Sequence, residues 1–278
     1  MSIRVRVLGD DDLAAVTELL AANPTDNLFV LARVSAFGLR PESLGCTVFG
    51  AERDGELVSL VHAGSNVVPI GLDEDTVELF AREFSALRWA SSIMGRADQV
   101  RPLWEALCRK ERSKWAMVRE LRPRQPLMAI EGPPAVEGDP RVREITLADV
   151  EPYFEAAVAM YTEEVGVNPI DASGSYRTYI RTLIMNRRAF GIVEDGKVLF
   201  KADVGSVFGP YCQIQGVWLA PELRGQGASI PAMASVVELV GRRHQHQSLY
   251  VNDFNTRARR LYRTVGFAEV GTFATVLY

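Results

Sequence analysis

The sequence has few cysteines and no long apolar run. Its three cysteines, Cys46, Cys108 and Cys212, stand far apart among 278 residues, without the close spacing of a metal site. A sparse, odd number of cysteines is typical of free thiols in a reducing compartment. No apolar stretch is long enough to cross a bilayer, and the first residues lack the core of a signal peptide. We therefore expect a cytoplasmic protein without a metal and without a membrane partner.

The chain also lacks a strong excess of one charge. It has 31 Lys and Arg residues against 35 Asp and Glu residues, a net charge of −4, so we expect no nucleic-acid partner. A basic run between residues 109 and 124 is interrupted by Glu111 and Glu120. We interpret it as a solvated face, with a nucleic-acid patch as the alternative. The length fits one large domain or two ordinary ones.

Two short sequence patterns each occur twice in the chain. Residues 5–8 form a strand pattern followed by Asp12 and Leu13, and residues 142–145 are followed in the same way by Asp149 and Val150. Residues 49–58 and 190–199 each indicate a strand, an Asp-Gly hairpin turn and a second strand. Both pairs keep the same order and nearly the same offset. They predict two copies of one fold in tandem, with chance similarity as the alternative.

Proline and glycine mark the boundary between the copies. Seven of these residues lie between Pro123 and Pro140, in a stretch that cannot be a helix. The expected domains are residues 1–122 and 141–278, with a linker over residues 123–140.

The second copy contains a strand, a glycine loop and a helix in direct succession. Residues 213–219 are rich in apolar residues, Pro221 ends the strand pattern, and an apolar stripe at helical spacing runs from Ile230 to Val240. The loop between them spans Arg224–Ser229 and contains two glycines. Unpaired amides at a helix N-terminus and a glycine backbone that a ligand can approach form an anion site. The alternative is a surface turn that happens to carry an arginine.

The loop is not a common nucleotide motif. It has no Gly-Lys-Ser/Thr ending and is therefore not a Walker A loop, and Ile230 stands where a dinucleotide fingerprint needs its third glycine. It resembles the acyl-CoA pyrophosphate loop of the GNAT acetyltransferase superfamily, Arg/Gln-x-x-Gly-x-Gly/Ala. Arg224 and Gly227 fill their places, whereas Ser229 replaces the usual Gly or Ala. The phrase N-x-x-A-x-x-L-Y-x-x-x-G-F at residues 255–267 is similar to a second motif of the same superfamily.

The two motifs cover most of residues 213–267. More narrowly, residues 161–169 and 248–255 resemble a bacterial group in which an uncharacterised GNAT-like half precedes a GNAT half. The resemblance implies an α+β (α/β) fold of two tandem GNAT-like domains, each a mixed, mostly antiparallel sheet with flanking helices. In the C-terminal domain, the parallel strands at residues 213–219 and 248–251 are expected to splay apart.

The same resemblance implies acetyl-CoA as a cosubstrate, bound in the gap between those strands. Strand backbone would pair with the pantetheine arm, loop amides would hold the pyrophosphate, and Asn255 would serve as an N-cap, a CoA contact or both. The expected cofactor-binding residues are Val217, Trp218, Leu219, Arg224, Gly225, Gln226, Gly227, Ala228, Ser229, Asn255, Ala258 and Tyr262.

Three residues are expected to take part in catalysis. The backbone N–H of Val217 would polarise the thioester carbonyl, and Tyr262 matches the tyrosine that protonates the departing thiolate. The spacing of Tyr262 also fits a core tyrosine. Glu164, or its neighbour Glu163, is the expected general base acting through water, and a solvated acidic pair is the alternative.

The first copy lacks the glycine loop. At the corresponding place, residues 79–87 indicate an ordinary helix with Phe80, Phe84 and Leu87 on its apolar face. A strand near residues 90–94 and a helix with Leu103 and Leu107 would follow. This half is expected to be structural or to shape the substrate cleft.

Together these features predict an N-acyltransferase. It would move an acetyl or short acyl group from acetyl-CoA to a primary amine of a small-molecule or peptide acceptor, by direct attack in a ternary complex. Three alternatives remain open: an acyl-CoA-binding regulator without turnover, a tRNA-dependent aminoacyl transferase, and a tandem domain that binds a protein partner. The acceptor and the oligomeric state stay open.

Overall fold

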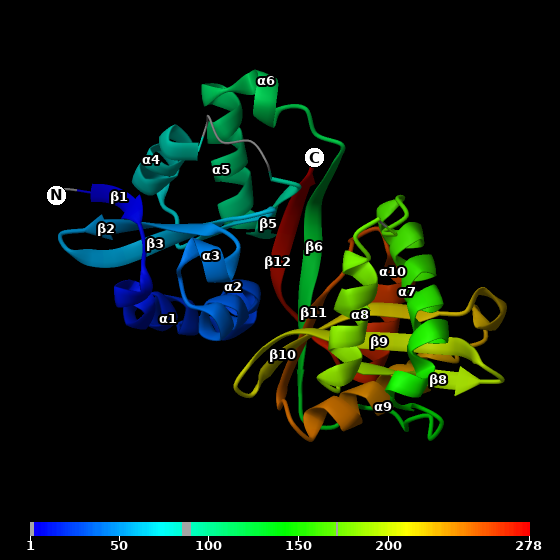
Figure 1. Ribbon diagram of the computed structural model, residues 1–278. Helices are drawn as coiled ribbons and strands as arrows, with labels where there is room; N and C mark the ends of the chain where they lie inside the picture. Colours follow the sequence, from blue (N-terminus) through cyan, green and yellow to red (C-terminus); the bar gives the residue numbers. More distant parts are fainter. Residues whose placement is uncertain (1–2, 85–89, 171) are drawn as a thin grey trace. The chain divides into compact units, whose positions relative to one another are not determined.

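The computed structural model describes residues 3–84, 90–170 and 172–278 (Figure 1). The chain forms two compact units. Unit 1 comprises Met1–Leu127, Tyr250–Phe254 and Val270–Tyr278, and unit 2 comprises Met128–Leu249 and Asn255–Glu269. No helix in the described ranges is both long and apolar enough to span a bilayer.

Unit 1 contains a sheet in the order β1-β2-β3-β4-β5-β12-β6. Its strands are β1 (Ile3–Val7), β2 (Thr47–Arg53), β3 (Glu56–Ala63), β4 (Asn66–Ile70), β5 (Ser92–Arg96), β12 (Ala268–Leu277) and the first part of β6 (Glu120–Glu131). Its helices are α1 (Leu13–Ala21), α2 (Pro24–Phe37), α3 (Pro41–Leu44), α4 (Glu74–Phe84), α5 (Ala97–Lys110) and α6 (Arg112–Trp115). Strands β4 and β5 are parallel, whereas β5 and β12 are antiparallel.

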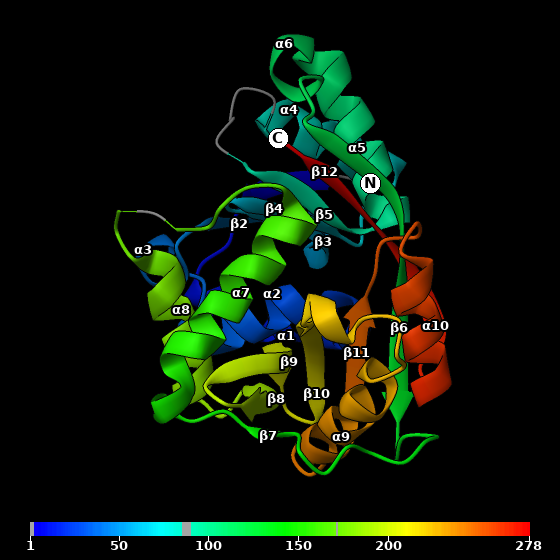
Figure 2. The same ribbon diagram turned by 90° about the vertical axis from the view of Figure 1, so that its right-hand side faces the viewer.

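Unit 2 contains the sheet order β6-β11-β10-β9-β8-β7, with the last part of β6 at its start. Its strands are β7 (Arg143–Glu144), β8 (Ala189–Glu194), β9 (Lys197–Phe208), β10 (Tyr211–Leu219) and β11 (His246–Tyr250). Its helices are α7 (Val150–Val165), α8 (Ser175–Met185), α9 (Ser229–Gly241) and α10 (Thr256–Val265). Helices α7 and α8 lie side by side over β8, β9 and β10 (Figures 1 and 2).

The two units repeat one succession of elements. Each has a first strand, helices, three strands, a helix, a strand and a further helix. Each also has one parallel pair at the equivalent place, β4 with β5 and β10 with β11, while the neighbouring pairs β3–β4 and β9–β10 are antiparallel. The predicted tandem fold with mixed, mostly antiparallel sheets is confirmed.

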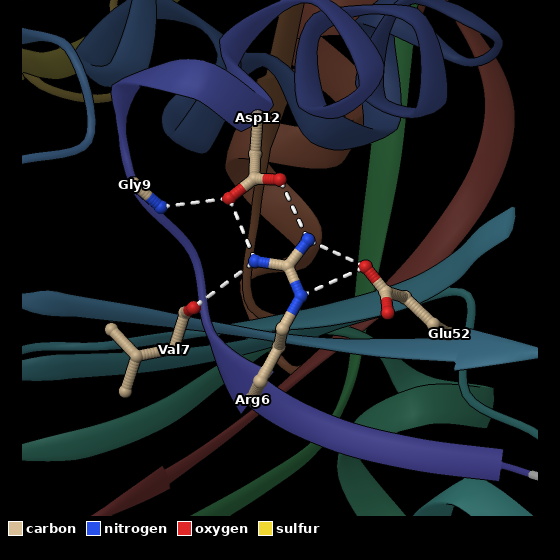
Figure 3. Close-up of polar contacts among 5 residues, drawn as sticks. All are labelled: Arg6, Val7, Gly9, Asp12 and Glu52. Atoms are coloured by element: carbon tan, nitrogen blue, oxygen red, sulfur yellow. Dashed lines mark hydrogen bonds and ion pairs between the residues drawn. The ribbon is translucent and has the colours of Figure 1, made fainter. Parts of the chain in front are cut away.

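The first repeated phrase forms the same corner in both units. In unit 1, Arg6 donates from Nη1 and Nη2 to the two carboxylate oxygens of Asp12, at 2.9 and 2.7 Å (Figure 3). The backbone N–H of Gly9 donates to Asp12 Oδ2 at 2.9 Å. Figure 3 also shows Glu52, which accepts from Arg6 Nε at 2.8 Å. The fork of hydrogen bonds ties the end of β1 to the turn before α1.

In unit 2, Arg143 and Asp149 repeat this arrangement. The two guanidinium–carboxylate hydrogen bonds are 2.8 and 2.8 Å long, and Thr146 N donates to Asp149 Oδ2 at 3.0 Å. In both corners the arginine lowers the pKa of the aspartate, first through its side-chain hydrogen bonds. The repeated sequence pattern therefore corresponds to the same local structure in both units.

Residues 123–140, expected to form a linker, are partly strand. β6 extends to Glu131, and its Pro123 and Pro126 lie within the strand. Unit 2 begins at Met128, and Val270–Tyr278 belongs to unit 1. The division in the structure thus differs from the expected boundaries, because long-range strand pairing assigns segments that local composition does not.

The C-terminal residues form one strand, β12, whose residues from Phe273 to Leu277 pair with β5. One other local expectation needs revision. The helix expected at residues 79–87 is α4, which runs from Glu74 to Phe84, and Leu87 lies outside the described residues.

Candidate functional site

Strand β10 loses its partner on one side halfway along. Its parallel register with β11 covers Tyr211–Gln213 opposite His246–Ser248. Among the described residues, no further pairing with β11 follows, although β10 runs on to Leu219. On its other side β10 stays paired with β9 as far as Leu219 opposite Phe200. We call the unpaired side of β10, from Ile214 to Leu219, the strand gap; it is the splay expected from the sequence.

A β-bulge lies in the middle of the strand gap. Gln215 pairs with Asp203 and Trp218 pairs with Lys201, so two residues of β10, Gly216 and Val217, face one residue of β9. Gly216 has φ +59°, and a Cβ there would lie 2.6 Å from Asp203 Oδ2 and 2.9 Å from Lys201 Nζ. Only glycine fits this conformation and this space. The bulge takes Val217 out of the regular ladder at the residue expected to polarise the carbonyl.

The glycine loop follows β10 after one short 3-10 helix, Pro221–Leu223, and is exposed from Arg224 to Gly227. Gly225 and Gly227 both have φ +80°, and a Cβ at either would meet nothing within 4 Å. The glycines are therefore needed for backbone conformation rather than for space. Within the described parts of the chain, the amides from Gly225 to Ser229 donate no hydrogen bond to the protein. They can bind an anion.

Within the described residues, helix α9 begins at the end of this loop without a side-chain cap. Its N-cap residue is Ala228, and Pro231 lies in the first turn. The amides and the positive end of the helix dipole therefore face the loop without a competing carboxylate. This arrangement suits a diphosphate.

The equivalent helix of unit 1, α4, carries its own anion. The Asp73 carboxylate accepts from Thr76 N at 2.9 Å, and Glu74 and Asp75 occupy the first turn. The Thr76 backbone hydrogen bond is the main cause that lowers the pKa of Asp73, to about 2. A phosphate would meet negative charge at this helix start.

Arg224 binds the protein itself. Its Nη2 lies 2.8 Å from Glu163 Oε2 on α7, and its Nε donates to the Leu219 carbonyl at 2.9 Å. The guanidinium lies 5.9 Å from the Trp218 ring. Arg224 thus fastens the start of the glycine loop to the end of α7. Glu163, paired with a guanidinium, is a poor candidate for the base.

Tyr262 and Glu164 lie within electrostatic reach of each other. Tyr262, on α10, is 7% exposed. Burial, followed by the negative charge of Glu164, raises the pKa of Tyr262. The phenol therefore keeps its proton at neutral pH, which is the state that a proton donor needs. The Tyr262 ring also packs 5.9 Å from the Phe267 ring, so a core role and a donor role are compatible.

Asn255 caps α10. Its side chain accepts from the backbone N–H of Ala258 at 3.1 Å, which confirms the N-cap. The Ala258 amide is used within the chain, so a contact to CoA at this turn would come from other atoms.

A buried polar network lies beside the bulge, and it was not predicted from the sequence. Lys201 Nζ lies 2.6 Å from Asp203 Oδ2 and donates to the Gly216 carbonyl at 2.8 Å. The Tyr153 hydroxyl donates to Asp203 Oδ1 at 2.6 Å. The side chains of Lys201 and Asp203 are 0% and 3% exposed. In the sequence, this network could have been recognised from the two charged residues, Lys201 and Asp203, at alternate positions of an apolar strand.

A split parallel pair, a bulged central strand and a glycine loop before a helix define the candidate site of unit 2. Two family models match the chain. Residues 46–153 match a domain of unknown function (DUF4081), and residues 168–267 match the acetyltransferase (GNAT) family. The C-terminal region is therefore a domain of the GNAT acetyltransferase family, whose fold supports acyl transfer in general.

Several solved structures share the tandem fold. An acetyltransferase of the GNAT family from Colwellia psychrerythraea is 13% identical, with 99% of both chains covered and a TM-score of 0.62. A GCN5-related N-acetyltransferase from Sphaerobacter thermophilus is 16% identical, with 98% of this chain and 94% of that chain covered and a TM-score of 0.64. A tandem GNAT protein from the clavulanic acid biosynthesis pathway is 15% identical, with 99% and 98% covered and a TM-score of 0.59. These likenesses concern the fold alone. None of the curated proteins compared with the sequence matches it.

Proposed function

We propose that unit 2 transfers an acetyl or short acyl group from acetyl-CoA to a primary amine of a small-molecule or peptide acceptor. The observation that carries this proposal is the position of the loop amides, Gly225 to Ser229, which follow the strand gap after one short 3-10 helix, Pro221–Leu223. An anion held at the loop would place the attached chain along the unpaired side of β10. Unit 1 would have a structural or substrate-shaping role.

The residues present fit acetyl-CoA. The loop amides would hold its pyrophosphate, and backbone groups of β10 on the side of the strand gap, around Val217, would pair with its pantetheine arm. When bound, acetyl-CoA supplies a thioester carbonyl for attack by the amine. Arg224 would keep the loop in place through Glu163 rather than contact the phosphates, because its guanidinium is already paired.

Three residues would then carry the chemistry. The Val217 N–H would donate to the carbonyl oxygen as negative charge develops there. Tyr262, which is protonated at neutral pH, would give its proton to the leaving thiolate. Glu164, near the end of α7, would accept a proton from the incoming amine through water. The electrostatic interaction between Glu164 and Tyr262 supports these roles.

Ligand binding can be tested without knowing the acceptor. Acetyl-CoA is expected to raise the melting temperature of the full chain, because it binds the folded state. Gly227→Trp, which places a bulky side chain on the loop, is expected to abolish this increase. Gly196→Trp is the matched control: Gly196 also has positive φ, at +71°, and open space around it, but lies in the β8–β9 turn.

The outcomes separate the candidate functions. If both variants retain the increase in melting temperature, the loop is not part of the binding site. If the wild type shows no increase, an acyl-CoA-dependent function is contradicted. A wild type that binds acetyl-CoA but never releases free thiol with any amine would instead indicate the non-catalytic regulator. A tRNA-dependent transferase has no use for the pyrophosphate loop, so acetyl-CoA binding would count against it.

A further inference from the structure

We propose that Lys201 is a positioning residue: by holding the Gly216 carbonyl, it turns the Val217 N–H toward the strand gap. The inference rests on the proposed function and deepens it, because it names what fixes the donor that polarises the thioester carbonyl. Asp203 and Tyr153 hold Lys201 in turn. The five residues come from α7, β9 and β10, all within unit 2.

The first step is the geometry of one peptide bond. The carbonyl of Gly216 and the N–H of Val217 belong to the same peptide plane, and in a trans peptide they point in opposite directions. The described chain contains no cis peptide bond. Lys201 Nζ donates to the Gly216 carbonyl at 2.8 Å, so the Val217 N–H points away from the ammonium. Lys201 Nζ also lies 5.2 Å from the Tyr153 ring of α7, so the ammonium holds this carbonyl from the face of the sheet that α7 covers, and the Val217 N–H, which the register with β9 skips, is left for the strand gap.

The second step concerns the bulge. In a regular ladder, hydrogen bonds to the neighbouring strand would fix this peptide plane. Gly216 and Val217 are the residues that the register skips, and Gly216 is at φ +59°. The peptide plane therefore needs another anchor, and the ammonium of Lys201 supplies it.

The third step concerns Lys201 itself. Its side chain is fully buried, and its carboxylate partner Asp203 lies 2.6 Å away. Burying such a pair gains little stability over an apolar pair of similar size, because both charges lose their hydration. The pair fixes the orientation of the ammonium instead. The Asp203 carboxylate accepts one hydrogen bond from Lys201 Nζ, and the Gly216 carbonyl accepts another.

Asp203 is thereby excluded as the general base. Its Oδ2 accepts from Lys201 and its Oδ1 accepts from the Tyr153 hydroxyl at 2.6 Å, so both oxygens are engaged. At 3% exposure it has no room to exchange a proton with a substrate amine through solvent. Its role is to hold the lysine.

The test measures carbonyl polarisation directly in the full chain, with acetyl-CoA labelled with carbon-13 at the acetyl carbonyl as the probe. In the wild type, the infrared stretch of the bound carbonyl is expected to lie below its frequency in solution, because an aligned N–H donor weakens the bond. Lys201→Met/Asp203→Leu is expected to lose this shift. Replacing both partners avoids an unpaired buried charge, so the double variant should fold and keep its acetyl-CoA-dependent increase in melting temperature.

Two variants complete the test. Tyr153→Phe removes one donor to Asp203 but leaves the Lys201–Gly216 hydrogen bond, so it should keep most of the carbonyl shift. Lys201→Arg, made as a single substitution, keeps a charged donor at this position. It should therefore keep part of the carbonyl shift. A double variant with the full wild-type shift would overturn the proposal, as would a wild type that binds acetyl-CoA without any shift. A wild type that does not bind acetyl-CoA would instead contradict the proposed function.

Discussion

A phenol can give a proton only while it holds one, and at Tyr262 burial and Glu164 together favour the protonated form. If Tyr262 protonates the thiolate, Tyr262→Phe should lower turnover about 10²-fold or more and leave acetyl-CoA affinity nearly unchanged. Thiol release with a panel of amines and calorimetric titration with acetyl-CoA would measure the two quantities. Tyr176→Phe is the control, because Tyr176 is a half-buried tyrosine on α8 that donates to the Ala157 carbonyl. Equal turnover in Tyr262→Phe would leave the residue a core role alone.

His62 makes unit 1 sensitive to pH. It contacts Cys46 Sγ through Nε2 at 3.1 Å and the Asn66 carbonyl through Nδ1 at 3.1 Å. Burial lowers the pKa of His62 from 6.5 to about 4. Between these values the unfolded chain binds more protons than the folded chain, so stability is full above the upper value and falls as the pH decreases.

We therefore expect the free energy of unfolding to drop by about 1–2 kcal/mol from pH 7 to pH 5. Urea titrations at the two pH values would measure it. His62→Phe should remove this drop, whatever its own stability, whereas His246→Asn, at a more exposed position, should keep it. A wild type equally stable at both pH values would contradict the assignment.

At the scale of elements, the two equivalent helix starts differ in how their amides are satisfied. Asp73 caps α4, whereas no side chain in the described part of the chain caps α9. Asp73→Ala should lower the stability of unit 1 by about 1 kcal/mol through loss of the N-cap. Asp75→Ala is the control, since that side chain is 75% exposed and lies 3.8 Å from Arg53. Chemical denaturation would decide, and equal effects of both substitutions would argue against the cap.

Elements defined by contiguous residues were predictable from the sequence. The glycine loop, the N-cap at Asn255 and the Arg-Asp corners each depend on a few neighbouring positions, so their chemistry can be read locally. The Arg224–Glu163 pair and the Lys201–Gly216 contact were not predicted. The first joins residues 61 positions apart, and the second depends on the register of a bulge. The residue pattern of one strand does not specify its register with the neighbouring strand, because the register depends on the residues of both strands.

At the scale of the whole molecule, unit 1 depends on residues 270–278. Their strand, β12, pairs with β5 over five residues and buries Phe273, Ala274 and Val276. Deleting these residues should destabilise unit 1 by more than about 3 kcal/mol, because it removes a large buried side chain and exposes an edge strand. Limited proteolysis should then cleave unit 1 first. A truncated chain as resistant as the full chain would contradict this expectation.

The shared strand has a consequence for biosynthesis. Residues 270–278 are translated after every residue of unit 2, although they complete the sheet of unit 1. The earliest-made part of the protein therefore waits, with the edge of β5 uncovered, until the later-made part has left the ribosome. Chain growth and fold completion run in opposite order, and this interval is when the nascent protein most needs protection from aggregation.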